Sequence, residues 1–264
     1  MKKRTVMAII FITGCFILFP GCRDQPGGNN SVKERDVLYQ VSTINSLVAG
    51  NYDGIRSILD LKSSGDAGIG TFDALDGELV MLDSKVYKVK STGEVQEIGN
   101  SGTVPFAAVT FFDKDVSKDI SNISSFDSLK LELDNLIENK ELFYAFRIDA
   151  TFLYVKTRSV PKQQKPFPIL SEVTKNQPTF EYTNVQGSLI GFWCPEYANG
   201  VNVSGYHLHF LSDDRTKGGH LLDVRLDQAR AYMDVTDFFK MYLSANTGNE
   251  NVSDIEKEIS KVEK

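Results

Sequence analysis

Three histidines form the group of residues in this chain with the clearest chemical meaning. His207, His209 and His220 are the only histidines among 264 residues, and they fall within a short stretch. Alternate side chains of a β-strand share a face, so we expect His207 and His209 to point the same way, about 7 Å apart. Leu208 and Phe210 would then face a core. The turn-rich segment 212–219 can reverse the chain and bring His220 beside the pair.

Three neutral imidazoles on one face suit Zn²⁺ and leave coordination positions open for water or substrate. This pattern is typical of a catalytic zinc site, because structural sites usually close all four positions. Imidazole also binds Cu, Ni, Co and Fe, so the residues indicate a metal site more strongly than they identify the metal. A histidine cluster without metal is the alternative interpretation.

Two charged residues elsewhere are candidates to join this site. Glu78 opens an expected strand after the Gly-rich segment 65–71, and Arg158 ends a long β-rich run. Each alone is more often a solvated surface charge. We expect 65–71 to be a tight loop rather than a nucleotide-binding loop, since it lacks the third fingerprint glycine and a phosphate-loop lysine.

Hydrophobic periodicity predicts an α+β fold with mixed β-sheets and a few short helices. The expected helices are 42–49, 55–61, 125–139 and, in the tail, 253–263. The expected strands are 78–82, 85–89, 104–112, 142–157, 179–182, 188–193, 206–211, 220–226 and 231–235.

Three prolines in the segment 161–168 predict an extended connection between two domains. An N-terminal α+β domain would cover 37–160. A C-terminal zinc-binding domain with a tail would cover 169–264. The metal site would then lie on adjacent strands of the C-terminal domain.

The N-terminus resembles an export signal over residues 1–22. Lys2, Lys3 and Arg4 precede the apolar run 6–19, which is short for a membrane span and suits a signal peptide. Pro20-Gly21-Cys22 resembles a bacterial lipobox, so Cys22 is a candidate lipidation site, with ordinary secretion or core burial of this cysteine as alternatives. The polar segment 23–36 is expected to be a flexible tether. We therefore expect an extracytoplasmic protein, secreted or lipid-anchored to the membrane.

Charge and cysteine content exclude some classes of function. The net charge is −6, and no cluster of Lys and Arg follows the leader, which argues against a nucleic acid partner. Besides Cys15 and Cys22, the chain contains only Cys194, so the folded part can form no internal disulfide. Its apolar neighbours predict that Cys194 is buried and inert.

Several motifs together resemble the bacterial α-acetolactate decarboxylase family over about residues 37–235. Those around the histidines are Gly205-Tyr206-His207-Leu208-His209-Phe210, Asp214-Arg215-Thr216 and Gly218-Gly219-His220. The others, in order, are 39–47, Gly65-Asp66, 68–71, Leu75-Asp76-Gly77-Glu78, 158–163 and 187–192.

The resemblance implies conversion of 2-acetolactate to (R)-acetoin and CO₂ by a zinc enzyme. It assigns zinc binding to His207, His209 and His220, and active-site roles to Glu78 and Arg158. A glutamate near the C-terminus reaches the metal in this family; here it matches Glu263, with Glu256 and Glu258 as alternatives. Family members resemble a two-domain α/β dimer, which implies a homodimer.

The residue types agree with that chemistry. Zn²⁺ would be the Lewis acid that stabilises the electron pair left by CO₂, so no organic cofactor is needed. Arg158 would bind the carboxylate or screen charge, and Thr71 would add a hydrogen bond. Glu78 or Glu263 would deliver the proton, a role that partial desolvation favours. The alternatives are another zinc enzyme, such as a hydrolase, and a non-enzymatic extracytoplasmic zinc-binding lipoprotein.

Overall fold

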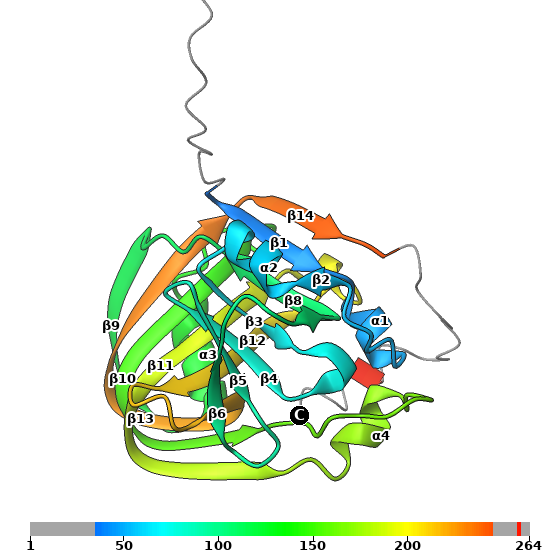
Figure 1. Cartoon of the computed structure of the whole chain (residues 1–264). Helices are drawn as coiled ribbons and strands as arrows, with labels where there is room; N and C mark the ends of the chain where they lie inside the picture. The colour runs from blue at the N-terminus through cyan, green and yellow to red at the C-terminus, as the bar shows by residue number, and fades with distance from the viewer. Residues whose placement is uncertain (1–34, 245–257, 260–264) are drawn as a thin grey trace, which may run out of the picture. The chain divides into compact units, whose positions relative to one another are not determined.

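The computed structural model describes residues 35–244 and 258–259 (Figure 1). Several predictions concern residues outside this part. They are the signal peptide 1–22 with Cys22, residues 23–34 of the tether 23–36, and the C-terminal glutamates Glu256 and Glu263. No helix among the described residues is long and apolar enough to cross a membrane.

Strands dominate the described chain, and the helices are short. The helices are Ile44–Val48 (α1), Ile58–Ser64 (α2), Phe126–Asp134 (α3) and Leu170–Thr174 (α4), with 3-10 turns at Asp73–Leu75 and Glu196–Ala198. The strands are Val37–Val41 (β1), Arg56–Ser57 (β2), Ala67–Thr71 (β3), Glu78–Leu82 (β4), Lys85–Val89 (β5), Val95–Ile98 (β6), Thr103–Val104 (β7), Phe106–Thr110 (β8), Val116–Ile123 (β9), Phe143–Arg158 (β10), Thr179–Cys194 (β11), Gly205–Ser212 (β12), Gly218–Thr236 (β13) and Phe238–Tyr242 (β14).

A seven-stranded sheet has the order β14-β1-β8-β3-β4-β5-β6. Its strands pair antiparallel except at one edge, where β1 and β14 run parallel. The predicted strands 78–82 and 85–89 are confirmed as β4 and β5, which pair antiparallel as a hairpin. At one end of the sheet, Thr71 of β3 pairs with Glu78 of β4, so the two predicted site residues are direct neighbours.

A second sheet, of order β10-β11-β12-β13-β9, closes on itself because β10 also pairs with β13. Its long, curved strands β10, β11 and β13 fill one side of Figure 1. A core cluster joins this sheet to α3 and contains Leu208 and Phe210, as the alternation of β12 predicted. The histidines therefore lie on the other face of β12.

The two sheets pack against each other through apolar side chains. Leu38 and Ile69 of the seven-stranded sheet contact a cluster that includes Phe192 and Cys194 of the second sheet. Cys194 is free and fully buried, and burial raises the pKa of its thiol. The prediction that this cysteine is buried and inert therefore fits its surroundings.

Strands from both sides of the connection 161–168 share the same sheets. β1 pairs with β14, and β10 pairs with β11 and β13 along most of its length. The expected mixed sheets with few short helices are confirmed, whereas the division into two domains at 161–168 stays a prediction that this pairing does not favour.

The Gly-rich segment 65–71 was expected to be a loop, and that prediction is wrong, because 67–71 form β3 in the middle of the sheet. The glycines permit close strand contact instead of a turn. A Cβ added to Gly68 would lie 2.3 Å from the Ala108 carbonyl oxygen, and one on Gly70 would lie 2.5 Å from the Phe106 carbonyl oxygen. Thr71 consequently stands at the end of a strand.

Local capping and strand continuity explain the other differences. The second helix starts at Ile58 rather than Ile55, because Ser57 and Asp60 form a capping box. The predicted strands 179–182 and 188–193 are parts of one strand, β11, and 220–226 and 231–235 are parts of β13. The predicted helix 125–139 ends at Asp134.

The turn between β12 and β13 reverses the chain as predicted, and Gly219 follows it in a conformation that suits glycine. Its φ is +131°, and an added Cβ would lie 2.6 Å from the Arg158 carbonyl oxygen. Since Arg158 and His220 are paired in register, this glycine sets how closely β10 and β13 approach at the histidines.

We expect Gly219→Ala to lower the free energy of unfolding by about 1–3 kcal/mol. The added methyl group would strain the backbone at this φ and push β13 away from the Arg158 carbonyl oxygen on β10. Gly99→Ala is the matched control: a Cβ there meets nothing within 4 Å, and we expect a change within about 0.5 kcal/mol. Urea unfolding measures both. Equal stabilities for the two variants would contradict this account of Gly219.

Candidate active site

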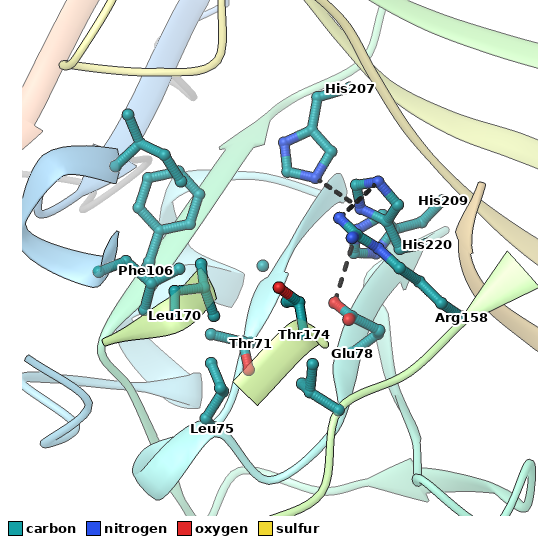
Figure 2. A pocket seen from close by; sticks show the side chains of 14 residues that line it. Thr71, Leu75, Glu78, Phe106, Arg158, Leu170, Thr174, His207, His209 and His220 are labelled. Atoms are coloured by element: carbon teal, nitrogen blue, oxygen red, sulfur yellow. Dashed lines mark hydrogen bonds and ion pairs between the residues drawn. The ribbon is translucent and has the colours of Figure 1, made fainter. Parts of the chain in front are cut away.

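The three histidines meet as the strand pattern predicted. His207 and His209 lie on β12, and His209 is paired in register with His220 on β13. Their ring centroids are 4.9–5.3 Å apart, and one ring nitrogen of each lies within 4.8 Å of the others. Figure 2 shows the three rings gathered at one end of a pocket. They are therefore close enough to share one metal ion.

Burial keeps these rings neutral. The exposed fractions of His207, His209 and His220 are 8%, 1% and 5%. Burial, with the nearby Arg158 charge, lowers the pKa of His207 to about 3. The pKa values of His209 and His220 are lowered well below their usual value, again mainly by burial. Neutral imidazole is the form that binds metals.

His209 is held in one tautomer by the neighbouring sheet. Its Nδ1–H donates to the Leu79 carbonyl oxygen on β4, at 2.9 Å. Its Nε2 must then carry a lone pair, and this atom is buried without a hydrogen-bond partner among the residues that the structure describes. A buried, unpaired nitrogen acceptor beside two other imidazoles fits a metal ligand.

Arg158 lies against the histidine group. It ends β10, is only 4% exposed, and its Nη2 lies 3.0 Å from His220 Nε2. His220 Nδ1 in turn lies 3.2 Å from His207 Nε2. The guanidinium thus brings a fixed positive charge to the pocket.

Glu78 and Thr71 complete the polar side of the pocket. Glu78 is 8% exposed, and its Oε2 lies 3.7 Å from His209 Nε2. Thr71 is also buried, and its hydroxyl donates to the Gly77 carbonyl oxygen at 2.8 Å. That bond fixes the chain just before Glu78 and leaves the Thr71 oxygen free to act as an acceptor.

The opposite wall of the pocket is mostly apolar, as Figure 2 shows for Phe106, Leu170 and Leu75. The pocket encloses about 460 Å³ of non-protein space, part of it open to solvent. The remaining lining residues are Ile44, Leu47, Gly70, Val160 and Thr174. A small molecule with one polar and one apolar side matches this shape and chemistry.

Sequence reasoning missed this apolar wall. Leu170 and Thr174 belong to α4, which was not predicted, and Phe106 looks like any core residue of a strand. The only sequence signal was the spacing of Ile44 and Leu47 in the predicted helix 42–49, which resembles ordinary core packing.

The C-terminal glutamates are described only in part. Glu263 and Glu256 lie outside the described residues, whereas Glu258 and Ile259 are helical. Ile259 is buried in an apolar cluster with residues of α1 and α4, including the pocket residues Leu47 and Leu170. Ile259 therefore brings the chain near its C-terminus to the apolar wall of the pocket.

Comparison with known proteins agrees with this site. The alpha-acetolactate decarboxylase family model matches residues 38–255. The chain is 44% identical over 232 residues to an alpha-acetolactate decarboxylase of Methanosarcina mazei, a match that covers 87% of this chain and 81% of that protein. A second such decarboxylase, from Bacillus subtilis, is 40% identical over 80% of each chain.

Solved structures give the same result. The crystal structure of alpha-acetolactate decarboxylase from Bacillus subtilis strain 168 matches with a TM-score of 0.83 and 38% identity, over 86% of this chain and 99% of that one. A Staphylococcus aureus protein of unknown function, described as similar to alpha-acetolactate decarboxylase, matches with a TM-score of 0.81 and 31% identity, over 86% and 99%. The chain belongs to the alpha-acetolactate decarboxylase family.

Proposed function

We propose that this protein is a carboxy-lyase that converts 2-acetolactate to acetoin and CO₂, with (R)-acetoin as the product. Membership of the family supports the reaction. The observation that carries the proposal is the meeting of three buried imidazoles, Glu78 and Arg158 around one small pocket. A protein that only captures metal needs neither the carboxyl group nor the guanidinium.

We propose Zn²⁺ as the ion held by His207, His209 and His220. Three neutral nitrogen ligands suit zinc, and the buried, unpaired Nε2 of His209 supports this ligand set. The hydrogen bond from His209 to the Leu79 carbonyl is the kind of outer contact that orients a metal-binding imidazole. When bound, the ion supplies a Lewis acid that stabilises negative charge on the substrate oxygens.

Arg158 binds and orients the substrate carboxylate. It is the one positively charged side chain among the residues that line the described pocket, and its burial strengthens its attraction for an anion. A guanidinium can hold a carboxylate through two parallel hydrogen bonds. Its Nη2 lies 3.0 Å from His220 Nε2, so the guanidinium stands at the histidine end of the pocket and the carboxylate is directed there.

Glu78 delivers the proton. The bond between the carboxylate carbon and the hydroxyl-bearing carbon breaks, and its electron pair is delocalised toward the neighbouring ketone. The carboxylic acid of Glu78 then protonates the hydroxyl-bearing carbon, which gives acetoin, and the resulting carboxylate regains a proton from solvent. Its Oε2 lies 3.7 Å from His209 Nε2, so the proton donor is next to the proposed metal ligands.

The remaining lining residues position the substrate. Thr71 offers its oxygen as an acceptor for a substrate hydroxyl, because its own proton is committed to Gly77. The apolar wall of Leu75, Phe106 and Leu170 faces the substrate methyl groups and excludes water from the reacting carbon. Delivery of the proton from one side only accounts for a single stereoisomer of acetoin.

A glutamate of the C-terminal tail is proposed to join the site. The burial of Ile259 beside α1 and α4 supports this, since it lies near the apolar wall of the pocket. Glu263 stays the first choice, and Glu258 and Glu256 are the alternatives. Four residues past Ile259 span about 6 Å in a helix and up to about 14 Å when extended.

Export and assembly are proposed from the sequence and from the family resemblance. The basic and apolar leader supports an extracytoplasmic location, and the residues before Cys22 support lipid anchorage, with cleavage and secretion as the alternative. Homodimer formation rests on the family resemblance alone.

Removal of the metal should abolish acetoin formation. With racemic acetolactate as substrate, we expect a strong chelator or His209→Ala to lower kcat by at least about 1000-fold, because the main stabiliser of negative charge is lost. Zinc should restore the chelated native protein but not the variant. Metal content, measured by mass spectrometry, must fall in parallel. Full activity in verified metal-free protein would refute the role of the ion.

Glu78→Gln should retain the metal and lose turnover, because the amide fills the same space but cannot deliver a proton. We expect kcat to fall by about 10²–10⁴-fold with unchanged metal content. Glu97→Gln is the matched control: Glu97 is an exposed residue of the same sheet, paired with Lys85, and its replacement should leave kcat unchanged. A normal kcat for Glu78→Gln would remove Glu78 from the mechanism.

Arg158→Lys should weaken substrate binding, because lysine keeps the charge but loses the two-pronged hydrogen bonding. We expect KM to rise at least about tenfold, the loss of roughly one charge-assisted hydrogen bond. Metal content and the circular dichroism spectrum should be unchanged. If KM stayed at the native value while metal was lost, Arg158 would instead act by holding His220.

A further inference from the structure

Three carboxylates meet at a second place in the protein, outside the histidine pocket. Asp36 precedes β1, Asp115 lies between β8 and β9, and Asp234 is near the end of β13. One oxygen of each lies within 4.8 Å of the other two. None of these residues lines the pocket described above.

Asp234 is the unusual member of this group. It is fully buried, with 0% of its surface exposed. Its Oδ2 accepts a hydrogen bond from the Asp113 backbone N–H at 3.2 Å, but its Oδ1 has no hydrogen-bond partner within 35–244 and 258–259. A buried carboxylate oxygen without a partner is costly, so it calls for a ligand or a proton.

The surrounding side chains add to the negative charge of this group. The side chains of Asp113 and Asp237 add negative charge near the group. Arg35 is paired with Asp113 and is also close enough to Asp36 and Asp234 to attract them, and the Lys114 ammonium lies 4.1 Å from the centre of the Tyr232 ring. Burial, and then the neighbouring carboxylates, raise the pKa of Asp234 to about 7. The negative charge of the cluster is therefore poorly neutralised by the protein itself.

We propose that Asp36, Asp115 and Asp234 form a binding site for a hard divalent cation, and that Ca²⁺ is the ion that fits it. The three ligands offer only oxygen, which suits Ca²⁺ and Mg²⁺ and not the metals that prefer imidazole. Ca²⁺ accepts six to eight oxygen ligands in flexible geometry at about 2.3–2.6 Å, whereas Mg²⁺ demands near-ideal octahedral geometry at about 2.0–2.1 Å. Carboxylate oxygens within 4.8 Å of one another can close on a shared Ca²⁺ through small side-chain movements.

The backbone holds these carboxylates in place. Asp115 Oδ2 accepts from the Val235 N–H at 2.9 Å, and the Asp36 carbonyl oxygen accepts from the Phe238 N–H at 3.0 Å. The site therefore joins the start of β1 to the junction of β13 and β14. An ion there would link the parallel edge of the seven-stranded sheet to the closed sheet, and its main effect would be on stability.

Calcium binding to the full-length, zinc-loaded protein tests this proposal. Titration calorimetry with CaCl2 should give one site with a Kd of about 10⁻⁴–10⁻³ M, the range of extracellular calcium-binding modules. At tenfold above Kd, Tm should rise by about 3–6 °C. Mg²⁺ should bind more weakly. His209→Ala should bind Ca²⁺ as the native protein does, which separates this site from the histidine group.

Asp234→Asn should weaken calcium binding at least tenfold and abolish the rise in Tm. Because a buried position can affect folding, Asp115→Asn, which alters an exposed ligand, serves as a second variant with the same expected loss. Asp227→Asn is the matched control, since Asp227 is an exposed residue of the same strand β13. Its replacement should leave the Kd for Ca²⁺ unchanged. The proposal would be overturned if no calcium bound at 10 mM, roughly ten times the weakest expected Kd, or if all variants bound calcium equally. A proton shared among the carboxylates would then be what neutralises the buried charge of Asp234.

Discussion

One hydrogen bond between the two sheets determines the geometry of the candidate active site. It runs from His209 Nδ1 on β12 to the Leu79 carbonyl oxygen on β4. The bond selects the tautomer of His209 and directs Nε2 into the pocket. Since Glu78 precedes Leu79 on the same strand, the bond also sets the separation between the carboxyl group and the imidazole. Neither sheet could produce this arrangement alone, because the histidines and Arg158 come from the closed sheet and Glu78 from the other.

Close strand contact supports that arrangement. A Cβ on Gly191 would lie 2.0 Å from the His207 carbonyl oxygen, so β11 and β12 can approach at His207 only because this residue is glycine. Gly219 has the same role between β13 and Arg158. On the opposite face of β12, Leu208 and Phe210 are held in the closed core. Side chains that are fixed on both faces of a strand have little freedom, which is what a preorganised site requires.

The parts that could be predicted from the sequence depend on short-range rules. Strand alternation placed His207 and His209 on one face, and the turn after Ser212 returned His220 beside them. Glu78 and Arg158 could not be brought to the site by such rules, since their positions depend on the packing of one sheet on another. That step required the family resemblance. The Gly-rich segment was misjudged because glycine permits both turns and close strand contact, and only the position of β8 distinguishes them. The α4 helix carries too short an apolar pattern to be recognised.

The charge balance of the proposed site explains both capture of the substrate and release of the product. Arg158 and a divalent ion bring three positive charges into a buried space, where Glu78, as the proton donor, carries its proton and adds no negative charge. The imidazoles add no charge, because burial keeps them neutral. Such an excess is costly away from water, and an anionic substrate reduces it. Loss of CO₂ followed by protonation removes the negative charge of the substrate, so acetoin leaves without breaking the ion pair that brought acetolactate in. The same electrostatic excess therefore favours the charged reactant over the neutral product.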